Sequence, residues 1–315
     1  MSYAIGIDLG GTSLKFAVVS AEGTLCYTDE IPSRASEGRE AVITQINHAI
    51  DACLSQSLPI CGIGIGTPGI TDEQGRTIEG GAENIVGWED VPLAEILEQA
   101  YHLPVCIAND ANAMALGEQA YGAARGCTDV LFITVGTGIG GALIIGGCLY
   151  GGYKNRGTEL GHTPIVAGGE PCACGSSGCL EAYASTSALV RRFETLCDAL
   201  GVEAPATADG RTVVELYHRS HPAAMRAMEE HWFYLGRALA GFINTFSPQR
   251  IVVGGGISEA GSFYIDALRR VALGQAIANC SVNTTIETAR LGNRAGVLGA
   301  ARLILSNQTC NPNPL

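Results

Sequence analysis

The sequence predicts an α/β fold built from two similar lobes, and three observations lead to this prediction. Apolar strand-like segments alternate with helix-like segments in both halves of the chain, as in sheets that are covered by helices. A strand that ends in a glycine turn and leads into a second strand occurs twice, around Asp8 to Thr12 and around Val135 to Gly138. The length of 315 residues suits two domains, since domains usually have about 100–200 residues.

Short apolar runs bounded by turn residues predict the strands of the first half. These are residues 3–8, 16–20, 25–27, 60–66 and 105–108. Apolar residues at helical spacing predict helices at 37–55 and 92–101. Ser36 stands where it can cap the first of these helices, and Pro92 suits the first turn of the second.

The second half repeats this alternation. Helices are expected at 187–200 and 223–246, and a strand at 251–253 leads into Gly254-Gly255-Gly256. The stretch 130–153 carries no charge and is long enough to span a membrane. Its eight glycines and its β-branched residues instead favour two strands, at 130–135 and 140–145, around a glycine turn.

The composition excludes several classes of function. A net charge of −12 without any basic run leaves no surface to neutralise nucleic-acid phosphates or to bind anionic lipid headgroups. No basic residue precedes Lys15, so no signal peptide is expected and the predicted location is cytoplasmic. Nine of the twelve cysteines are scattered, mostly in apolar segments, and are expected to be small core residues in a reducing compartment.

Three glycine turns follow apolar strands: Gly10-Gly11-Thr12, Gly136-Thr137-Gly138 and Gly254-Gly255-Gly256. Glycine lets backbone N–H groups approach phosphate oxygens without interference from Cβ. Near the first turn, the Asp8 carboxylate can hold a magnesium-bound water, the Thr12 hydroxyl can bond a phosphate, and Lys15 follows. The P-loop and dinucleotide fingerprints are absent, so the three turns together predict a nucleotide site of another type.

A cluster of potential metal ligands follows the middle of the chain. His162 precedes Cys172, Cys174 and Cys179, which crowd into eight residues with glycines between them. Three thiolates and one imidazole fill the tetrahedron that structural Zn²⁺ prefers and leave no open catalytic position. Binding of Zn²⁺ would also fix Glu159 and Glu181 at the two ends of the loop.

Asn109 and Asp110 end a predicted strand and start a helix, where either residue can serve as an ordinary helix cap. A carboxylate in this position is also held rigidly, and it can accept the proton of a hydroxyl that attacks phosphorus. Both interpretations are compatible, so Asp110 is the candidate catalytic base.

The stretch from Glu159-Leu-Gly-His162 to Cys172-Ala-Cys174-Gly175-x-x-Gly178-Cys179-Leu-Glu181 resembles the signature of the ROK family of bacterial sugar kinases and sugar-responsive repressors. The glycine turns and Asn109-Asp110 extend the resemblance over nearly the whole chain. The resemblance implies a two-lobed, actin-like (ribonuclease-H-like) ATPase fold. It further implies a homodimer that uses ATP, Mg²⁺ and a structural Zn²⁺.

The resemblance also implies roles for the matching residues. Asp110 is the expected general base, and the residues expected to bind sugar hydroxyls are Asn109, Asp110, Glu159, His162 and Glu181. His162 would bind zinc through one ring nitrogen and the sugar through the other. In the expected nucleotide site, Asp8 lies near Mg²⁺, and Gly255 and Gly256 lie beside the adenosine. The residues expected around the phosphates are Gly10, Gly11, Thr12, Lys15, Gly136, Thr137 and Gly138. The expected lobes are residues 1–109 with 295–315, and residues 110–294, which carry the zinc loop and the dimer surface.

Asn84-x-x-Gly-Trp88 resembles a segment that lines the sugar site of family glucokinases, although Trp88 is equally suited to a core position. Glucose is therefore the first expected substrate. Kinases for N-acetylmannosamine, N-acetylglucosamine, mannose, fructose or allose are alternatives, because the family's usual glycine before Glu159 is Thr158 here. A sugar-responsive repressor and a sensor without turnover are disfavoured, the former because no helix-turn-helix segment precedes Asp8 and the latter because the candidate catalytic residues are intact.

Overall fold

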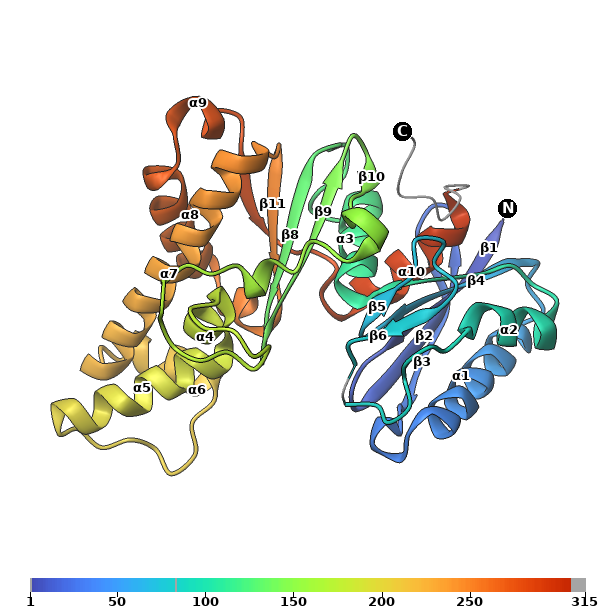
Figure 1. The fold of residues 1–315 in the computed structure, drawn as a ribbon, viewed down its shortest axis with the longest axis horizontal. Coiled ribbons are helices and arrows are strands. Elements are labelled where there is room, and N and C mark those ends of the chain that lie inside the picture. The colour runs from blue at the N-terminus through green and yellow to red at the C-terminus, as the bar shows by residue number, and fades with distance from the viewer. Residues whose placement is uncertain (1, 83, 307–315) are drawn as a thin grey trace. The chain divides into compact units, whose positions relative to one another are not determined.

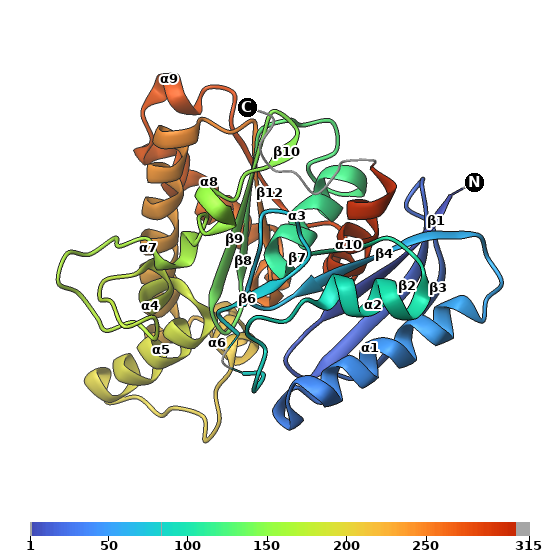
Figure 2. The same cartoon turned by 45° about the vertical axis from the view of Figure 1, so that its right-hand side comes forward.

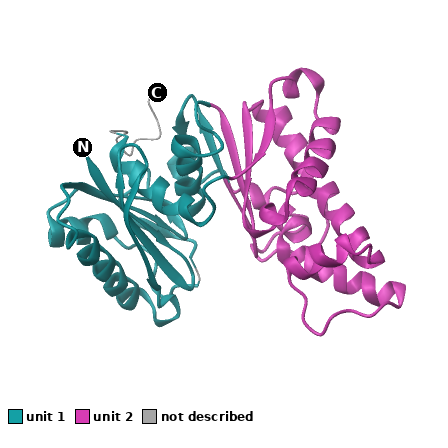
Figure 3. Ribbon diagram, turned by 180° about the vertical axis from the view of Figure 1, so that it is seen from behind, with its two compact units in different colours: residues 1–128, 142–158, 290–315 teal, residues 129–141, 159–289 magenta. Residues whose placement is uncertain are grey.

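The computed structural model describes residues 2–82 and 84–306, and the chain divides into two compact units (Figure 1, Figure 3). The first unit comprises residues 1–128, 142–158 and 290–315, and the second comprises residues 129–141 and 159–289. The first unit contains one complete five-stranded sheet. Most of the second five-stranded sheet lies in the second unit, but its residues 142–149 are assigned to the first.

The first sheet has the strand order β3-β2-β1-β4-β7. Its strands are β1 (Tyr3–Leu9), β2 (Ser13–Ser20), β3 (Leu25–Pro32), β4 (Ile60–Thr67) and β7 (Val105–Asn109). The second sheet has the order β10-β9-β8-β11-β12. Its strands are β8 (Val130–Val135), β9 (Ile139–Ile145), β10 (Cys148–Leu149), β11 (Arg250–Gly254) and β12 (Thr285–Thr288), and a small separate sheet pairs β5 (Ile70–Thr71) with β6 (Ile78–Gly80).

The two five-stranded sheets repeat one topology. In each, an antiparallel strand pair (β1 and β2, or β8 and β9) is followed by a parallel neighbour (β4 or β11) and then by a second parallel strand (β7 or β12). The uncharged stretch 130–153 forms β8, β9 and β10, which confirms the prediction of strands in place of a membrane helix. Among the described residues, no helix combines the length and apolar character that a membrane span requires.

Helices cover both faces of the first sheet (Figure 2). Apolar side chains of α1 (Arg39–Leu54) and α2 (Leu93–Tyr101) pack on one face, where Ile46, Ile50 and Leu97 are fully buried. On the other face, α10 (Ala295–Leu305) packs Val297 and Ala301 against small residues of β1 and β2. The remaining helix of this unit, α3 (Asp110–Tyr121), packs against α10.

The helices of the second unit are α4 (Leu180–Ala184), α5 (Thr186–Leu200), α6 (Gly210–His218), α7 (Pro222–Phe246), α8 (Ser262–Gln275) and α9 (Ala278–Ser281). Short 3₁₀ helices occur at Ala35–Glu37, Tyr153–Asn155, Leu160–His162, Gly256–Ala260 and Gly292–Arg294. The long helix α7 buries Met228, Trp232, Leu235, Leu239, Phe242 and Ile243, as its apolar stripe predicts.

The compact units divide the chain differently from the expected boundary between residues 109 and 110. Helix α3 belongs to the first unit because it packs closely on α10: a Cβ at Gly299 would lie 1.6 Å from the carbonyl oxygen of Ala113. The fully buried carboxylate of Glu118 on α3 reinforces this packing. It accepts hydrogen bonds from the backbone N–H groups of Arg290 and Leu291, at 2.9 and 2.8 Å.

Local details of the prediction also need correction. The residue that caps α1 is Gly38 and not Ser36, because residues 35–37 form a separate 3₁₀ helix. Pro92 precedes α2 as its capping residue. The free cysteines Cys53 and Cys197 are buried as expected for core residues, whereas Cys26 and Cys61 are exposed.

Candidate active site

Asp8 and Asp110 lie at the same edge of the first sheet. Strands β1, β4 and β7 run parallel, and their register pairs Asp8 with Gly66 and Thr67 with Asn109. Asp110 starts α3 directly after β7. Gly66 carries no side chain between them, and the Asp110 carboxylate acts electrostatically on Asp8. The structure thus brings the predicted magnesium and catalytic carboxylates together where parallel sheets bind ligands.

Both carboxyl groups are perturbed by their surroundings. Burial raises the pKa of Asp8 to about 6; the neighbouring Asp110 adds to the rise, and Lys15, opposite Asp8 on β2, counteracts it. Burial also raises the pKa of Asp110, and the hydrogen bond from the backbone N–H of Ala111 opposes this rise. Paired carboxylates of this kind favour binding of a cation, which would relieve their repulsion.

We expect Asp8→Asn to stabilise the ligand-free protein at pH 7. The pKa of Asp8 rises on folding from its ordinary 3.8 to about 6, so stability falls as the pH rises between these values and stays low above them. At about 1.4 kcal/mol per unit, the gain for the variant is at most about 3 kcal/mol, less because Asp8 is partly exposed. Urea denaturation at pH 4 and pH 7 measures it. A variant that is no more stable than the wild type at pH 7 would contradict the prediction.

Asn109 is the N-cap of α3, as one of the two sequence interpretations predicts. Its Oδ1 accepts hydrogen bonds from the backbone N–H groups of Ala111 and Asn112, at 2.9 and 3.4 Å. Its Nδ2 donates to the carbonyl oxygen of Gly69 at 3.1 Å. These contacts fix the start of α3, so the backbone that carries Asp110 is held rigidly.

The first glycine turn connects β1 to β2. Gly10, Gly11 and Thr12 form this turn, closed by a 2.9 Å hydrogen bond from the Gly10 N–H to the carbonyl oxygen of Ser13. The exposed Asn84 lies beside it, since its Nδ2 is 3.4 Å from where a Cβ of Gly11 would stand. By contrast, Trp88 is buried and donates from Nε1 to Thr67 Oγ1 at 3.0 Å, so it is a core anchor.

The other two glycine turns meet in the second unit. Gly136, Thr137 and Gly256 line a cavity of 840 Å³ whose remaining walls come largely from α5 and α6. This volume is in the range of pockets for drug-sized ligands, about 300–1,000 Å³. Gly138 lies outside the lining: a Cβ there would stand 2.5 Å from Glu181 Oε2. The cavity joins the predicted phosphate and adenosine turns and has room for a nucleoside.

Gly255 holds the third turn against β8. Its φ is +88°, and a Cβ would lie 2.2 Å from the carbonyl oxygen of Val135. We expect Gly255→Ala to destabilise the protein by about 3 kcal/mol and to weaken nucleotide binding, because both the backbone conformation and the contact become strained. Thermal denaturation and nucleotide titration measure the two effects. The matched control is Gly256→Ala, since a Cβ there meets nothing within 4 Å; equal loss of stability in both variants would contradict the prediction.

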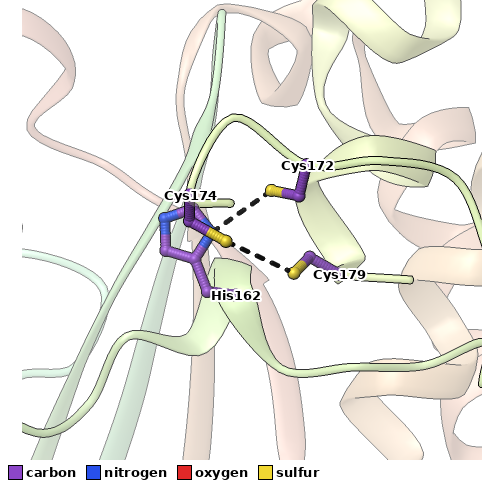
Figure 4. A group of neighbouring side chains, drawn as sticks. All are labelled: His162, Cys172, Cys174 and Cys179. Atoms are coloured by element: carbon purple, nitrogen blue, oxygen red, sulfur yellow. Dashed lines mark hydrogen bonds between the residues drawn. The ribbon is translucent and has the colours of Figure 1, made fainter. Parts of the chain in front are cut away.

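His162, Cys172, Cys174 and Cys179 come together as the sequence predicts, with their ligand atoms all within 4.8 Å of one another (Figure 4). Sγ of Cys174 is 3.7 Å from Sγ of Cys179, and Sγ of Cys172 is 3.6 Å from Nδ1 of His162. With Zn–S near 2.3 Å and Zn–N near 2.0–2.1 Å, a tetrahedral site has S···S edges of about 3.8 Å and S···N edges of about 3.6 Å. These two of the six ligand-atom distances therefore match the edges of a tetrahedral zinc site.

Tight turns shape the loop that carries these ligands. Gly178 has φ +77°, and a Cβ there would lie 1.8 Å from the carbonyl oxygen of Val166. Burial raises the pKa of the Cys179 thiol to about 12, so a cation is needed to hold it as a thiolate. The loop is also tied to α5, because Glu170 forms ion pairs with Arg191 and Arg192 at 3.0 and 2.9 Å.

Glu159 and Glu181 lie at the two ends of this loop, as predicted. Glu159 is exposed and precedes the 3₁₀ helix that contains His162. Glu181, in the first turn of α4, accepts a 2.8 Å hydrogen bond from the backbone N–H of Ile139. Glu181 therefore connects the metal loop to the glycine turn between β8 and β9, a contact that the sequence does not reveal.

The predicted site residues thus form two groups, one in each unit. The first unit holds Asp8, Gly10, Gly11, Thr12, Lys15, Asn84, Asn109 and Asp110. The second unit holds Gly136, Thr137, Gly138, Glu159, His162, Cys172, Cys174, Cys179, Glu181, Gly255 and Gly256.

Comparison with known proteins identifies the family. Residues 4–307 match the ROK family. The chain belongs to the ROK family. A glucokinase of Streptomyces coelicolor is 36% identical over 315 residues, which cover 96% of this chain and 98% of that protein. The structure of a ROK family glucokinase from Streptomyces griseus, in complex with glucose and AMPPNP, has a TM-score of 0.82 at 34% identity and covers 97% of this chain and 100% of that one.

The ROK family also contains regulators. A putative xylose repressor of Caldicellulosiruptor sp. is 31% identical over 320 residues, which cover 98% of this chain and 79% of the repressor.

The similarity to the glucokinase structure confirms the predicted α/β, two-lobed actin-like fold class for this ROK protein.

Several residues that line the cavity of this ROK protein were not predicted from its sequence. Thr186, Arg191 and Asp209 line the cavity of the second unit. Asp209 caps α6 through a 2.7 Å hydrogen bond from the Thr212 N–H, which lowers the pKa of its carboxyl group. An Asp followed three residues later by Thr at a helix start was a detectable capping signal, but nothing in the sequence places it beside the glycine turns.

The loop before the metal site departs from the usual ROK pattern. Thr158, where the family resemblance leads us to expect glycine, has φ +64°, a left-handed backbone that favours glycine. Upstream, Asn155 donates to the carbonyl oxygen of Thr71 at 3.0 Å, and Arg156 pairs with Glu79 at 2.6 Å. The loop is therefore docked on the β5 and β6 hairpin within the first unit.

Proposed function

We propose that this protein transfers the γ-phosphoryl group of ATP to a hydroxyl of glucose, giving glucose 6-phosphate. The observation that carries the proposal is the pairing of Asp8 and Asp110 at one sheet edge, beside the turn of Gly10 to Thr12. Phosphoryl transfer needs a bound cation, phosphate-binding backbone groups and a base for the attacking hydroxyl, and this edge offers all three. The high identity to glucokinases over nearly the whole chain supports glucose as the acceptor.

Each group has a chemical task in this proposal. Asp110 accepts the proton of the sugar hydroxyl as the bond to phosphorus forms, and Asn109 fixes the helix start that carries it. Asp8 would hold Mg²⁺, which would supply positive charge to neutralise the phosphates. The glycine turns around Gly11 and Thr137 bind the phosphates through backbone N–H groups, and the cavity of the second unit takes the adenosine.

The metal loop orients the sugar-binding groups. The three cysteines and Nδ1 of His162 would hold a structural zinc ion, and Nε2 of the same ring would then be left to bind a sugar hydroxyl. Glu159 and Glu181 are positioned by the same loop and bind further hydroxyls. The geometry that supports this is the match of two ligand-atom distances to a tetrahedral site.

The protein is proposed to act as a homodimer in the cytoplasm. Helix α7 supports the dimer, because it leaves the large apolar side chains of Met225 and Phe233 exposed, with exposed fractions of 38% and 48%. Methionine and phenylalanine are enriched at subunit interfaces relative to the rest of the protein surface. Light scattering coupled to size-exclusion chromatography measures the mass in solution, and a monomer at micromolar concentration contradicts the dimer.

A coupled assay of ADP release tests the function. Glucose, mannose, fructose, allose, N-acetylglucosamine and N-acetylmannosamine are compared at equal concentrations with ATP and Mg²⁺. We expect the highest kcat/KM with glucose. A higher kcat/KM with another sugar would reassign the substrate. If no sugar stimulates ADP release, the kinase assignment is overturned in favour of a sensor or a repressor. Binding of operator DNA in a gel-shift assay then distinguishes a repressor from a sensor.

A further inference from the structure

A second polar cavity lies in the first unit, away from the residues proposed to bind substrate. It has a volume of 700 Å³ and is formed by the turn between β2 and β3, the end of α3 and one side of α10. This turn is at the opposite end of β2 from the Gly10 to Thr12 turn. Because β2 has eight residues at about 3.4 Å each, the two turns are roughly 25 Å apart.

Three arginines line this cavity: Arg125 after α3, Arg294 at the start of α10 and Arg302 in its last turn. Within residues 2–82 and 84–306, none of their side chains forms an ion pair or hydrogen bond. By contrast, Arg76 and Arg192 elsewhere in the chain do pair with glutamates. In a protein of net charge −12, three arginines that line one cavity and have no carboxylate partner among the described residues indicate a site for an external anion.

The geometry of the arginines follows from helix periodicity. Arg294, the N-cap of α10, and Leu298 and Arg302 within it are spaced four residues apart and so lie on one face of the helix. Leu291, which precedes the helix, also lines the cavity. Guanidinium groups bind phosphate oxygens in a planar, two-pronged arrangement, so a phosphate suits this cluster better than a halide.

The rest of the lining indicates an organic ligand. Leu25, Tyr121, Leu291 and Leu298 provide apolar surface beside the arginines. Tyr121 is held in place, since its hydroxyl donates to the carbonyl oxygen of Ala21 at 3.3 Å and its ring packs on Gly23. Among the described residues that line the cavity, Glu22 is the one with a carboxylate. It accepts a hydrogen bond from Ser20 Oγ at 2.9 Å and can also accept one from a ligand hydroxyl.

We propose that this cavity binds a phosphorylated organic metabolite, with the arginines on its phosphate groups and the apolar wall on its carbon skeleton. The site does not depend on the kinase proposal, because it shares no residue with the candidate active site. Helix α10 connects the two regions physically: a Cβ at Gly296 would lie 2.4 Å from the carboxyl carbon of Asp8.

Isothermal titration calorimetry tests the proposal with a hexose bisphosphate, inorganic phosphate and unphosphorylated hexose as probes. The candidate active site is kept saturated with AMPPNP and glucose throughout. We expect the bisphosphate to bind tighter than inorganic phosphate, and its affinity to fall with added salt because the contacts are ionic. The unphosphorylated hexose gives no further binding.

The double variant Arg125→Gln with Arg302→Gln should bind the bisphosphate at least tenfold more weakly. The matched control is Arg270→Gln, an exposed arginine on α8 without an ion pair in the described part of the chain. Circular dichroism confirms that the variants are folded.

The proposal is overturned if the bisphosphate does not bind, or if the double variant and the control bind it equally. It is also overturned if inorganic phosphate binds as tightly as the bisphosphate. A failed kinase assay leaves this binding result unaffected, so the two proposals are tested separately.

Discussion

Asp110→Asn is expected to lower kcat by about 10²–10⁴-fold, with little change in the KM for glucose. Asparagine keeps the size of the side chain and the Oδ1 atom that accepts the hydrogen bond from the Ala111 N–H, so the start of α3 is preserved. What is lost is the ability to accept the proton of the sugar hydroxyl. The measurement is steady-state kinetics of ADP release, with glucose and ATP each varied.

The pH profile provides a second test of Asp110. Burial raises the pKa of its carboxyl group, and only the ionised form can act as a base. We therefore expect kcat of the wild type to fall with decreasing pH through this raised pKa, and expect the variant to lack this limb. A variant that retains kcat within tenfold of the wild type excludes Asp110 as the base.

A matched control separates loss of the base from a general change in charge. Glu30 on β3 is exposed and also acts electrostatically on Asp8. Glu30→Gln removes one negative charge in the same unit without altering the sheet edge, and kcat should change by less than twofold or so, because surface charges are screened by salt. A loss comparable to that of Asp110→Asn would mean that net charge, not proton transfer, limits the rate.

The sequence predicts the parts of the site that depend on short stretches of chain. The metal ligands were predictable because glycines such as Gly175 and Gly178 permit tight turns between closely spaced cysteines. Asp8 and Asp110 could each be singled out because one ends a strand before a glycine turn and the other starts a helix after a strand. That they lie at one edge of the sheet follows from the parallel register of β1, β4 and β7, which was not predicted from the sequence.

Packing between distant segments was not predictable in the same way. The sequence suggests a boundary at residue 110, but Gly299 allows α10 to approach Ala113 so closely that α3 becomes part of the first unit. The cavity walls from α5 and α6 depend on the same kind of tertiary contact. Trp88 is a further example. The sequence pattern suits a residue that lines the sugar site and a core residue equally, and the hydrogen bond to Thr67 in the structure assigns Trp88 to the core.

Cys174→Ser is expected to abolish stoichiometric zinc binding and to raise the KM for glucose by about 10–100-fold. Its Sγ lies 3.7 Å from Sγ of Cys179, so the variant removes one corner of the proposed tetrahedron. Serine is a poor ligand for Zn²⁺, and without the ion His162 and the loop up to Glu181 lose their orientation. Elemental analysis gives the metal content per chain, and steady-state kinetics gives KM for glucose and ATP separately.

The KM values for glucose and for ATP, compared between the variants, show whether loss of zinc is what weakens glucose binding. KM for ATP should change less than KM for glucose, because the proposed nucleotide-binding residues Gly136 and Gly256 lie outside the metal loop. The loop reaches the turn between β8 and β9 through Glu181, so a smaller rise in KM for ATP is expected. Cys61→Ser is the matched control, since this exposed cysteine lies on β4 in the other unit. Unchanged zinc content in Cys174→Ser, or equal zinc loss in Cys61→Ser, would show that the four-residue cluster does not hold the ion. Zinc lost without any change in KM for glucose would show that the loop positions the sugar-binding groups unaided.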